Sequence, residues 1–295
     1  MKVGLIDVDG HKFPNLALMK ISAYHKMRGD EVEWAFPMAR YDIVYQSKVF
    51  DETYSPDIDW IPQADKIIKG GTGYGLDNKL PYEIEHIYPD YSLYPELTRD
   101  TAYGFLTRGC PRHCEFCIVG DKEGLRSVKV ADLSEFWRGQ KYIKLLDPNI
   151  LCCGADRLEL LGQLADSGAY VDFTQGLDIR AINPAVIERI NRIKIKEIHF
   201  AWDNPNQDLT TEFAYYAGAA KHKPHGSYGT VYVLTNFGTT MEENLYRIYT
   251  LRDLGYDPYV MVYDKPNAPK DIKRLQRWCN NRAIFKLCMS FEDYR

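Results

Sequence analysis

Residues 103–117, which read YGFLTRGCPRHCEFC, place three cysteines directly behind a short apolar stretch. Cys110 and Cys114 are separated by three residues, and Cys114 and Cys117 by two. Thiolates with this spacing can converge on one soft metal centre, and three thiolates without a fourth leave one metal position open. The stretch therefore predicts a metal centre with a free position at which chemistry can occur.

Two other uses of these cysteines have to be considered. A structural zinc site needs a fourth ligand, such as His113 or a distant cysteine. His113 directly precedes Cys114 inside the loop, and the sequence offers no second ligand pair of the usual zinc spacing. A disulfide framework is disfavoured because seven cysteines are an odd number and the chain begins without a secretion signal. The spacing favours an iron–sulfur cluster, with a non-catalytic zinc or iron–sulfur protein as the alternative.

The composition is that of a protein with a full hydrophobic core. The 295 residues, 45% of them hydrophobic, suffice for one large domain or two smaller ones. A net charge of −4 without a basic stripe argues against a protein that grips nucleic acid. No apolar run reaches about eighteen residues, so we expect no membrane span, and we expect a reducing cytoplasm as the compartment.

From residue 102 onward the sequence alternates between strand-like and helix-like segments. The strand-like runs are 102–107, 143–146, 169–174, 197–202, 230–234 and 258–263. Asn183-Pro184 predicts one helix start, Thr240 with Glu243 forms a capping box at another, and a last helix is expected near Pro269. This α/β alternation predicts parallel strands with right-handed crossovers, and six units predict a partial (β/α)6 TIM-like barrel over 102–295.

The first hundred residues are expected to form a separate, smaller α/β unit. Strands are predicted at 2–8, 31–36, 42–46 and 66–68, with a helix over 15–27. These elements predict a small doubly wound, Rossmann-like domain over 1–78. Residues 79–101 are rich in proline and tyrosine, which predicts an extended connection between the two domains.

The pattern Cys110-x3-Cys114-x-Phe116-Cys117 resembles the signature of the radical S-adenosylmethionine superfamily. The resemblance implies a four-iron four-sulfur cluster on the three thiolates, with S-adenosylmethionine chelated by the fourth iron. It further implies reductive cleavage of that cofactor to methionine and a 5'-deoxyadenosyl radical that acts on an unidentified substrate. An external electron donor such as flavodoxin or ferredoxin belongs to this chemistry. The superfamily fold is a six-unit partial barrel with its cluster loop after the first strand, which is where these cysteines lie.

Polar residues follow five successive predicted strands, at the edge where the active sites of such barrels lie. The candidates are Asp147, Asn149, Arg180, Asp203, Asn204, Asn236 and Gly238. Arg180 offers a planar fork to the methionine carboxylate, and Asp203 or Asn204 can accept from the ribose hydroxyls. The resemblance places Gly238, Asn236 and Phe116 near the adenine. The glycine-glycine-glutamate segment common in the family is absent, so Asp147 and Asn149 are the candidates for the cofactor's amino group.

The N-terminal domain resembles the cobalamin-binding domain that precedes the barrel in one radical S-adenosylmethionine class. The resembling residues are Asp9-Gly-His11, Phe13-Pro-Asn-Leu16, Ser47 and Gly70-Gly71. The resemblance implies His11 as the cobalt ligand, although Pro14 stands where the motif has glycine. Three possibilities stay open: the domain binds cobalamin with His11 or with no lower ligand, it only covers the barrel mouth, or it binds a substrate. Hydrogen abstraction and methyl transfer are accordingly both expected reaction types.

Overall fold

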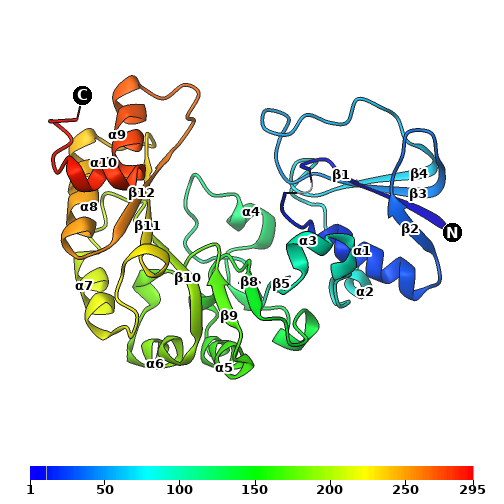
Figure 1. Ribbon diagram of the computed structural model, residues 1–295, viewed down its shortest axis with the longest axis horizontal. Helices are drawn as coiled ribbons and strands as arrows, with labels where there is room; N and C mark the ends of the chain where they lie inside the picture. The colour runs from blue at the N-terminus through cyan, green and yellow to red at the C-terminus, as the bar shows by residue number, and fades with distance from the viewer. Residues whose placement is uncertain (11, 295) are drawn as a thin grey trace. The chain divides into compact units, whose positions relative to one another are not determined.

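The computed structural model describes residues 1–10 and 12–294 and has a mixed α/β organisation (Figure 1). The chain divides into two compact units. The first comprises Met1–Gly104 with Ala131–Ile143, and the second comprises Phe105–Val130 with the chain from Lys144 onward. Among the described residues, no helix has the length and apolar character needed to span a membrane.

The first unit is built on a four-stranded parallel sheet with the order β2-β1-β3-β4. A helix connects β1 to β2, whereas loops connect β2 to β3 and β3 to β4. The elements of this unit are β1 (Lys2–Asp7), α1 (Leu16–Met27), β2 (Glu31–Trp34), β3 (Arg40–Ser47), β4 (Gln63–Gly70), α2 (Tyr82–Glu85), η1 (Tyr91–Leu93), α3 (Pro95–Thr98), β5 (Thr101–Gly104) and η2 (Leu133–Glu135).

The two faces of this sheet are covered differently. Val3 and Leu5 alternate with Ile6 along β1, so they lie on opposite faces. Val3 and Leu5 pack with Leu18 of α1, which buries one face under the helix. Ile6 packs with Val44, and loop residues cover this second face, namely Ala35, Ala39, Ile58 and Trp60. The apolar alternation of β1 thus supplies both halves of the core of the first unit.

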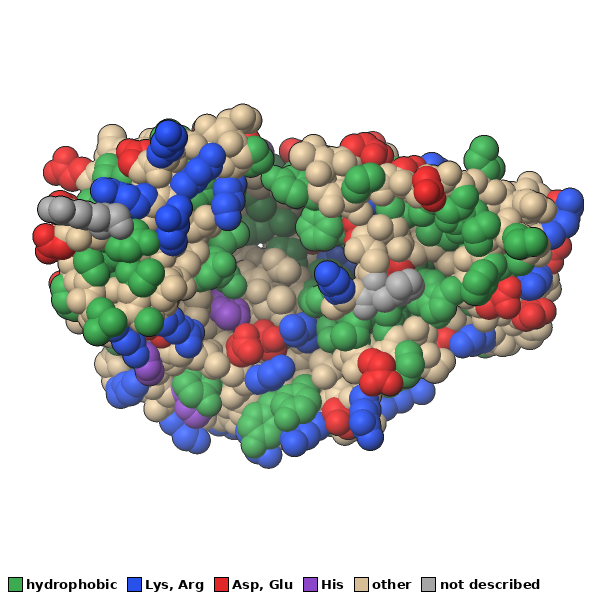
Figure 2. Space-filling view, turned by 45° about the horizontal axis from the view of Figure 1, so that its top comes forward, with side chains coloured by type: hydrophobic (Ala, Val, Ile, Leu, Met, Phe, Trp, Pro, Cys, Tyr) green, Lys and Arg blue, Asp and Glu red, His purple; other side chains and the backbone are tan. Residues whose placement is uncertain are grey.

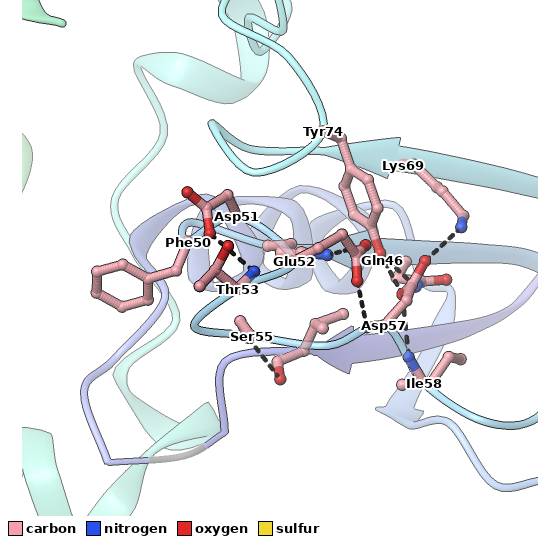
Figure 3. Close-up of polar contacts among 12 residues, drawn as sticks. Gln46, Phe50, Asp51, Glu52, Thr53, Ser55, Asp57, Ile58, Lys69 and Tyr74 are labelled. Atoms are coloured by element: carbon pink, nitrogen blue, oxygen red, sulfur yellow. Dashed lines mark hydrogen bonds and ion pairs between the residues drawn. The ribbon is translucent and has the colours of Figure 1, made fainter. Parts of the chain in front are cut away.

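A closed group of polar side chains fixes the loop between β3 and β4 (Figure 3). Tyr74 donates to Asp57 Oδ1 at 2.6 Å, and Lys69 Nζ lies 2.9 Å from Asp57 Oδ2. Gln46 donates its Nε2 to both Asp57 and the Tyr74 oxygen. Burial acts to raise the pKa of Asp57, but the bonds from Tyr74 and Lys69 outweigh it and hold that pKa at about 2. These hydrogen bonds and the ion pair join Asp57 of the loop to Gln46 of β3 and Lys69 of β4, so they hold the loop against both strands.

The segment 79–101, which the sequence predicts as an extended connection, contains α2, η1 and α3 and belongs to the first unit. Tyr94 donates its hydroxyl to Asp7 Oδ2 at 2.7 Å, and Tyr91 donates to the carbonyl of Phe136 at 2.6 Å. The tyrosines of this segment therefore fasten it to the first unit through their hydroxyl groups as well as through ring packing.

The second unit carries most of a six-stranded sheet with the order β12-β11-β10-β9-β8-β5, and β9 to β12 pair in parallel. Helices α5 to α8 lie along one side of these strands in Figure 1. The elements are β6 (Thr107–Arg108), α4 (Val119–Glu123), β7 (Val128–Lys129), β8 (Tyr142–Leu145), η3 (Ile150–Cys152), α5 (Arg157–Ser167), β9 (Tyr170–Phe173), η4 (Ile179–Ala181), α6 (Pro184–Arg192), β10 (Lys194–Ala201), α7 (Thr210–Ala219), η5 (Gly226–Tyr228), β11 (Thr230–Thr235), α8 (Met241–Asp253), β12 (Asp257–Val262), α9 (Lys270–Asn280) and α10 (Arg282–Leu287).

The predicted helix starts are confirmed by their caps. Asn183 Oδ1 accepts from the Val186 amide at 3.0 Å, and Pro184 is the first residue of α6. Thr240 and Glu243 form the reciprocal capping box that begins α8. Each side chain satisfies a backbone donor that the first helical turn leaves free, so the sequence alone locates both starts.

Candidate iron–sulfur site

The loop that carries the cysteines follows β6 and packs against the residues that come directly after α4 in the sequence. Gly109 has φ +84°, and a Cβ on it would lie 2.1 Å from the Arg126 carbonyl oxygen. Only glycine permits that approach. The Cys110 amide donates to the Gly124 carbonyl at 3.1 Å, and the Gly109 amide donates to Glu123 Oε2 at 3.2 Å. The first cysteine is therefore placed by backbone contacts that need no metal.

The three thiols share one neighbourhood and none is in a disulfide. Cys110 and Cys114 are partly buried, whereas Cys117 is exposed. Burial raises the pKa of Cys114, and the nearby Cys117, Asp203 and Cys110 raise it further, whereas Arg180 acts to lower it. The loop thus presents its sulfurs close to residues that follow β9 and β10.

Three thiols on one loop form a donor set for a soft metal centre. None of the three is in a disulfide, and three thiolates leave one iron of a four-iron cluster without a protein ligand, so this donor set fits an iron–sulfur cluster.

Aromatic contacts connect the cysteine loop to the ends of β11 and β12. Phe116 packs edge-on against Phe237 at 5.6 Å between ring centroids, and Phe237 packs against Tyr263 at 4.8 Å. Asn236, with φ +64°, donates its side-chain amide to the Tyr263 carbonyl at 2.8 Å. Gly238 has φ +62° and open space where a Cβ would lie. These three candidate residues, Phe116, Asn236 and Gly238, are therefore gathered at one end of the sheet.

Asn149 contacts the first cysteine directly. Its Nδ2 donates to Cys110 Sγ at 3.4 Å and to Asp178 Oδ2 at 3.2 Å. The residue is 4% exposed, and its Oδ1 has no hydrogen-bond partner among the described residues. A buried amide oxygen without a partner is costly, so it marks a place where an external donor would be accepted.

Asp178 and Arg112 are functional candidates that sequence reasoning did not select. The Asp178 side chain is 4% exposed and accepts from Arg112 Nε, from Arg180 Nε at 2.7 Å and from the Arg180 amide at 3.2 Å. Burial acts to raise the pKa of Asp178, but Arg180 and Arg112 outweigh it and the pKa is lowered. Cys152 Sγ lies 3.7 Å from the same carboxylate. Asp178 lies among the polar residues that follow β9, and that position could have identified it as a candidate from the sequence.

Asp147, a candidate for binding the cofactor's amino group, is occupied by the backbone. Its Oδ1 accepts from the Leu106 amide at 2.9 Å, and its Oδ2 accepts from the Thr107 amide at 2.6 Å and hydroxyl at 2.5 Å. Burial raises its pKa to about 7, against the lowering effect of these bonds. The predicted strand 102–107 is divided in the structure: β5 ends at Gly104, and Thr107 begins the short strand β6, with the Leu106 and Thr107 amides bonded to Asp147.

Asp203 lies where β10 ends, beside an arginine that sequence reasoning missed. Its Oδ1 accepts from the Leu234 amide at 3.1 Å, and burial raises its pKa to about 6. Arg247 of α8 is 1% exposed and donates to the carbonyls of Trp202, Asp203 and Leu234. Asn204 is exposed and accepts from the Asn206 amide at 2.9 Å, as a turn residue does. Asp203, rather than Asn204, is therefore the side chain held within the site.

The residues that resemble a cobalamin motif are engaged in packing of the first unit. His11 lies outside the described residues. Asp9 accepts from the Val49 amide at 2.6 Å and the Phe50 amide at 3.2 Å. A Cβ on Gly71 would lie 2.3 Å from the Lys48 carbonyl oxygen, and one on Gly73 2.2 Å from the Phe50 carbonyl oxygen. The glycines and the aspartate thus fasten two loops together in this structure.

Comparison with known proteins shows a likeness to solved structures. No family model matches the chain, and no curated protein matches it in sequence. A solved structure that it is similar to is the radical S-adenosylmethionine methyltransferase TsrM from Kitasatospora setae, with cobalamin and a [4Fe-4S] cluster bound. The sequences are 12% identical, the alignment covers 88% of this chain and 69% of the other, and the TM-score is 0.41.

Proposed function

We propose that this protein is a radical S-adenosylmethionine enzyme whose Cys110, Cys114 and Cys117 hold a four-iron four-sulfur cluster. The observation that carries the proposal is a loop with three unpaired thiols, anchored by Gly109, whose middle cysteine lies near Asp203 and Arg180. When bound, the cluster would pass one electron from an external donor to S-adenosylmethionine, which would supply methionine and a 5'-deoxyadenosyl radical for hydrogen abstraction or methyl transfer. The protein's part is to position these groups and to exclude water.

Asn149 is the better of the two candidates for the cofactor's amino group. Both oxygens of Asp147 already accept from Leu106 and Thr107, whereas Asn149 Oδ1 is buried and has no partner in the part of the chain that the structure describes. The Asn149 Nδ2 bond to Cys110 Sγ holds this side chain beside the first cluster ligand. One side chain thus joins the cluster ligand to the amino-group position.

Arg180 and Asp203 have the remaining polar roles. Arg180 is oriented by its Nε bond to Asp178 and its Nη1 bond to Gln207, which leaves Nη2 for the methionine carboxylate. Asp203 accepts from the Leu234 amide through Oδ1, which leaves Oδ2 for the ribose hydroxyls. Phe116 with Phe237 forms an aromatic wall, and Asn236 with Gly238 allows close backbone approach, as the adenine would require.

An external electron donor, such as flavodoxin or ferredoxin, is part of the proposal. Residues 265–286 contain seven lysines and arginines against one acidic residue, Asp271, in a chain whose net charge is −4. Figure 2 shows lysine and arginine side chains gathered over this C-terminal part of the second unit. This segment begins directly after β12, whose end carries Tyr263 of the aromatic wall. A basic surface there would steer an acidic electron-transfer protein towards the cluster.

The finer fold assignments also belong to this proposal. The six-stranded sheet with its intervening helices supports a partial (β/α)6 barrel, and the βαβ arrangement of β1, α1 and β2 supports a Rossmann-like first domain. A reducing cytoplasm suits seven cysteines of which none is paired. No step is assigned to cobalamin, because the residues of its motif are used in loop packing.

Anaerobic reconstitution tests the proposal. We expect about four irons per chain and, with dithionite and S-adenosylmethionine, formation of 5'-deoxyadenosine. Replacing Cys110, Cys114 and Cys117 by alanine should abolish both, while far-ultraviolet circular dichroism stays unchanged. Cys279→Ala is the control, because Cys279 is buried in α9 and its pKa is raised by burial to about 12. Stoichiometric zinc without cofactor cleavage would instead support the non-catalytic metal protein.

A further inference from the structure

A second group of possible metal ligands lies on neighbouring strands of the second unit. Asp172 of β9 is paired in register with Glu197 of β10, and His199 follows two residues later on the same face of β10. Ile198 and Phe200 alternate with them and are buried on the opposite face. One oxygen from each carboxylate and one ring nitrogen of His199 lie within 4.8 Å of one another.

His199 is not held by the hydrogen bonds that a structural histidine usually makes. Its Nε2 lies 3.5 Å from Glu197 Oε2, which is long for a hydrogen bond. Its Nδ1 is buried and has no partner among the described residues. The ring stacks on Tyr232 at 5.5 Å and 87% of the side chain is buried. The imidazole is therefore oriented by packing while its nitrogens remain available to a ligand.

The charges of this group do not balance. Asp172 is 3% exposed, and the cation that the structure pairs with it is Lys144, whose Nζ lies 3.3 Å from Asp172 Oδ2. Apart from His199, two carboxylates and one ammonium leave one negative charge. The pKa of Tyr232 is raised, first by burial and also by Asp172 and Glu197, so the excess charge acts on the strand beside them. Asp172 and His199 are largely buried and Glu197 is 39% exposed, so a cation could reach this group from the Glu197 side and would offset the excess charge.

We propose that Asp172, Glu197 and His199 form a site for a divalent first-row metal ion such as Mn²⁺, Fe²⁺ or Zn²⁺. Two carboxylates and one imidazole are ligands that such ions accept, and three protein ligands leave coordination positions open for water or a substrate. His199 lies within β10, whereas Asp203, the residue near Cys114, follows the end of that strand. The site is thus distinct from the cysteine loop and does not depend on the proposed cluster.

Cobalt binding to the untagged full-length chain with Cys110, Cys114 and Cys117 replaced by alanine tests this site without the cysteine loop. We expect one Co²⁺ per chain, with ligand-field bands and without sulfur-to-cobalt charge-transfer absorption. Asp172→Asn, Glu197→Gln and His199→Gln should each weaken binding by at least about tenfold. His225→Gln, at an exposed histidine of the same unit, should leave the affinity unchanged.

Lys144→Gln provides a variant whose expected effect is a gain. Removal of the competing ammonium should tighten Co²⁺ binding several-fold, which a merely misfolded variant would not do. Absence of binding, affinity that all three ligand variants retain, or a Lys144→Gln affinity that does not rise would each overturn the metal site. Iron content and deoxyadenosine formation by the unmodified protein report separately on the proposed function.

Discussion

Gly109→Ala is the sharpest perturbation of the cysteine loop, because it alters no proposed ligand. The new Cβ would lie 2.1 Å from the Arg126 carbonyl oxygen, whereas ordinary contacts begin near 3.4 Å, so the loop must move by about 1.3 Å. That displacement also lengthens the hydrogen bond from the Cys110 amide to the Gly124 carbonyl. Metal–ligand distances tolerate roughly 0.2 Å. We therefore expect reconstituted iron to fall from about four per chain to below about one, on the chemistry of such clusters.

Gly168→Ala is the matched control for this substitution. Gly168 also has positive φ, +67°, and caps α5, but its Cβ would meet nothing within 4 Å. It should lose about 1–2 kcal/mol of unfolding free energy from the left-handed conformation and keep its full cluster. Iron content by colorimetric assay and urea unfolding separate the two effects. Full cluster binding by Gly109→Ala would refute the reasoning that this contact places Cys110.

Three further predictions concern other parts of the structure. Arg247→Met should lower the unfolding free energy by about 3 kcal/mol or more, because three backbone carbonyls lose their buried donor. The control Arg192→Met, at an exposed ion pair with Asp166, should lower it by less than about 1 kcal/mol. Equal losses of the two variants in urea unfolding would contradict the role assigned to Arg247. Binding of S-adenosylmethionine should weaken as pH falls through about 6, where Asp203 becomes protonated and loses acceptor capacity; equilibrium dialysis should show no such step in Asp203→Asn, and a step of equal size there would assign it to another group. Titration with hydroxocobalamin should leave the cobalamin spectrum unchanged, and a saturable spectral shift would show that the loops around Asp9 and Gly71 open to admit it.

The sequence predicts elements well where the signal is local. The caps at Asn183 and Thr240 determine where α6 and α8 begin, because each cap bonds to a backbone amide three residues away. The cysteine triplet is equally local, since its spacing is contained in one loop. Strand positions in the second unit follow from short apolar runs and agree with β8 to β12 within about three residues.

Side-chain roles that depend on distant partners were not predictable in this way. Arg247 lies on a capped, amphipathic helix and resembles a surface arginine, yet it is buried because the ends of β10 and β11 present carbonyls to it. Asp147 follows a predicted strand and could have faced a cofactor. Its carboxylate instead accepts from the Leu106 and Thr107 amides, which lie 41 and 40 residues earlier in the sequence, and a contact over that distance leaves no local signal. The basic residues of 265–286, by contrast, lie in one continuous stretch and were a local signal that the sequence prediction of no basic stripe overlooked.

The contacts around the cysteines bear on whether metal is needed to fold the loop. Asp147 accepts from the Thr107 amide just before the cysteine loop, Gly109 packs on Arg126, and Asn149, which follows β8, donates to Cys110 Sγ. These contacts involve backbone groups and buried side chains, and none of them requires iron. The conformational entropy of such a loop is lost when the protein folds, so cluster binding involves little further loss. This is why the cysteine variants are expected to lose the cluster without losing the fold, in contrast to small zinc domains that unfold without metal.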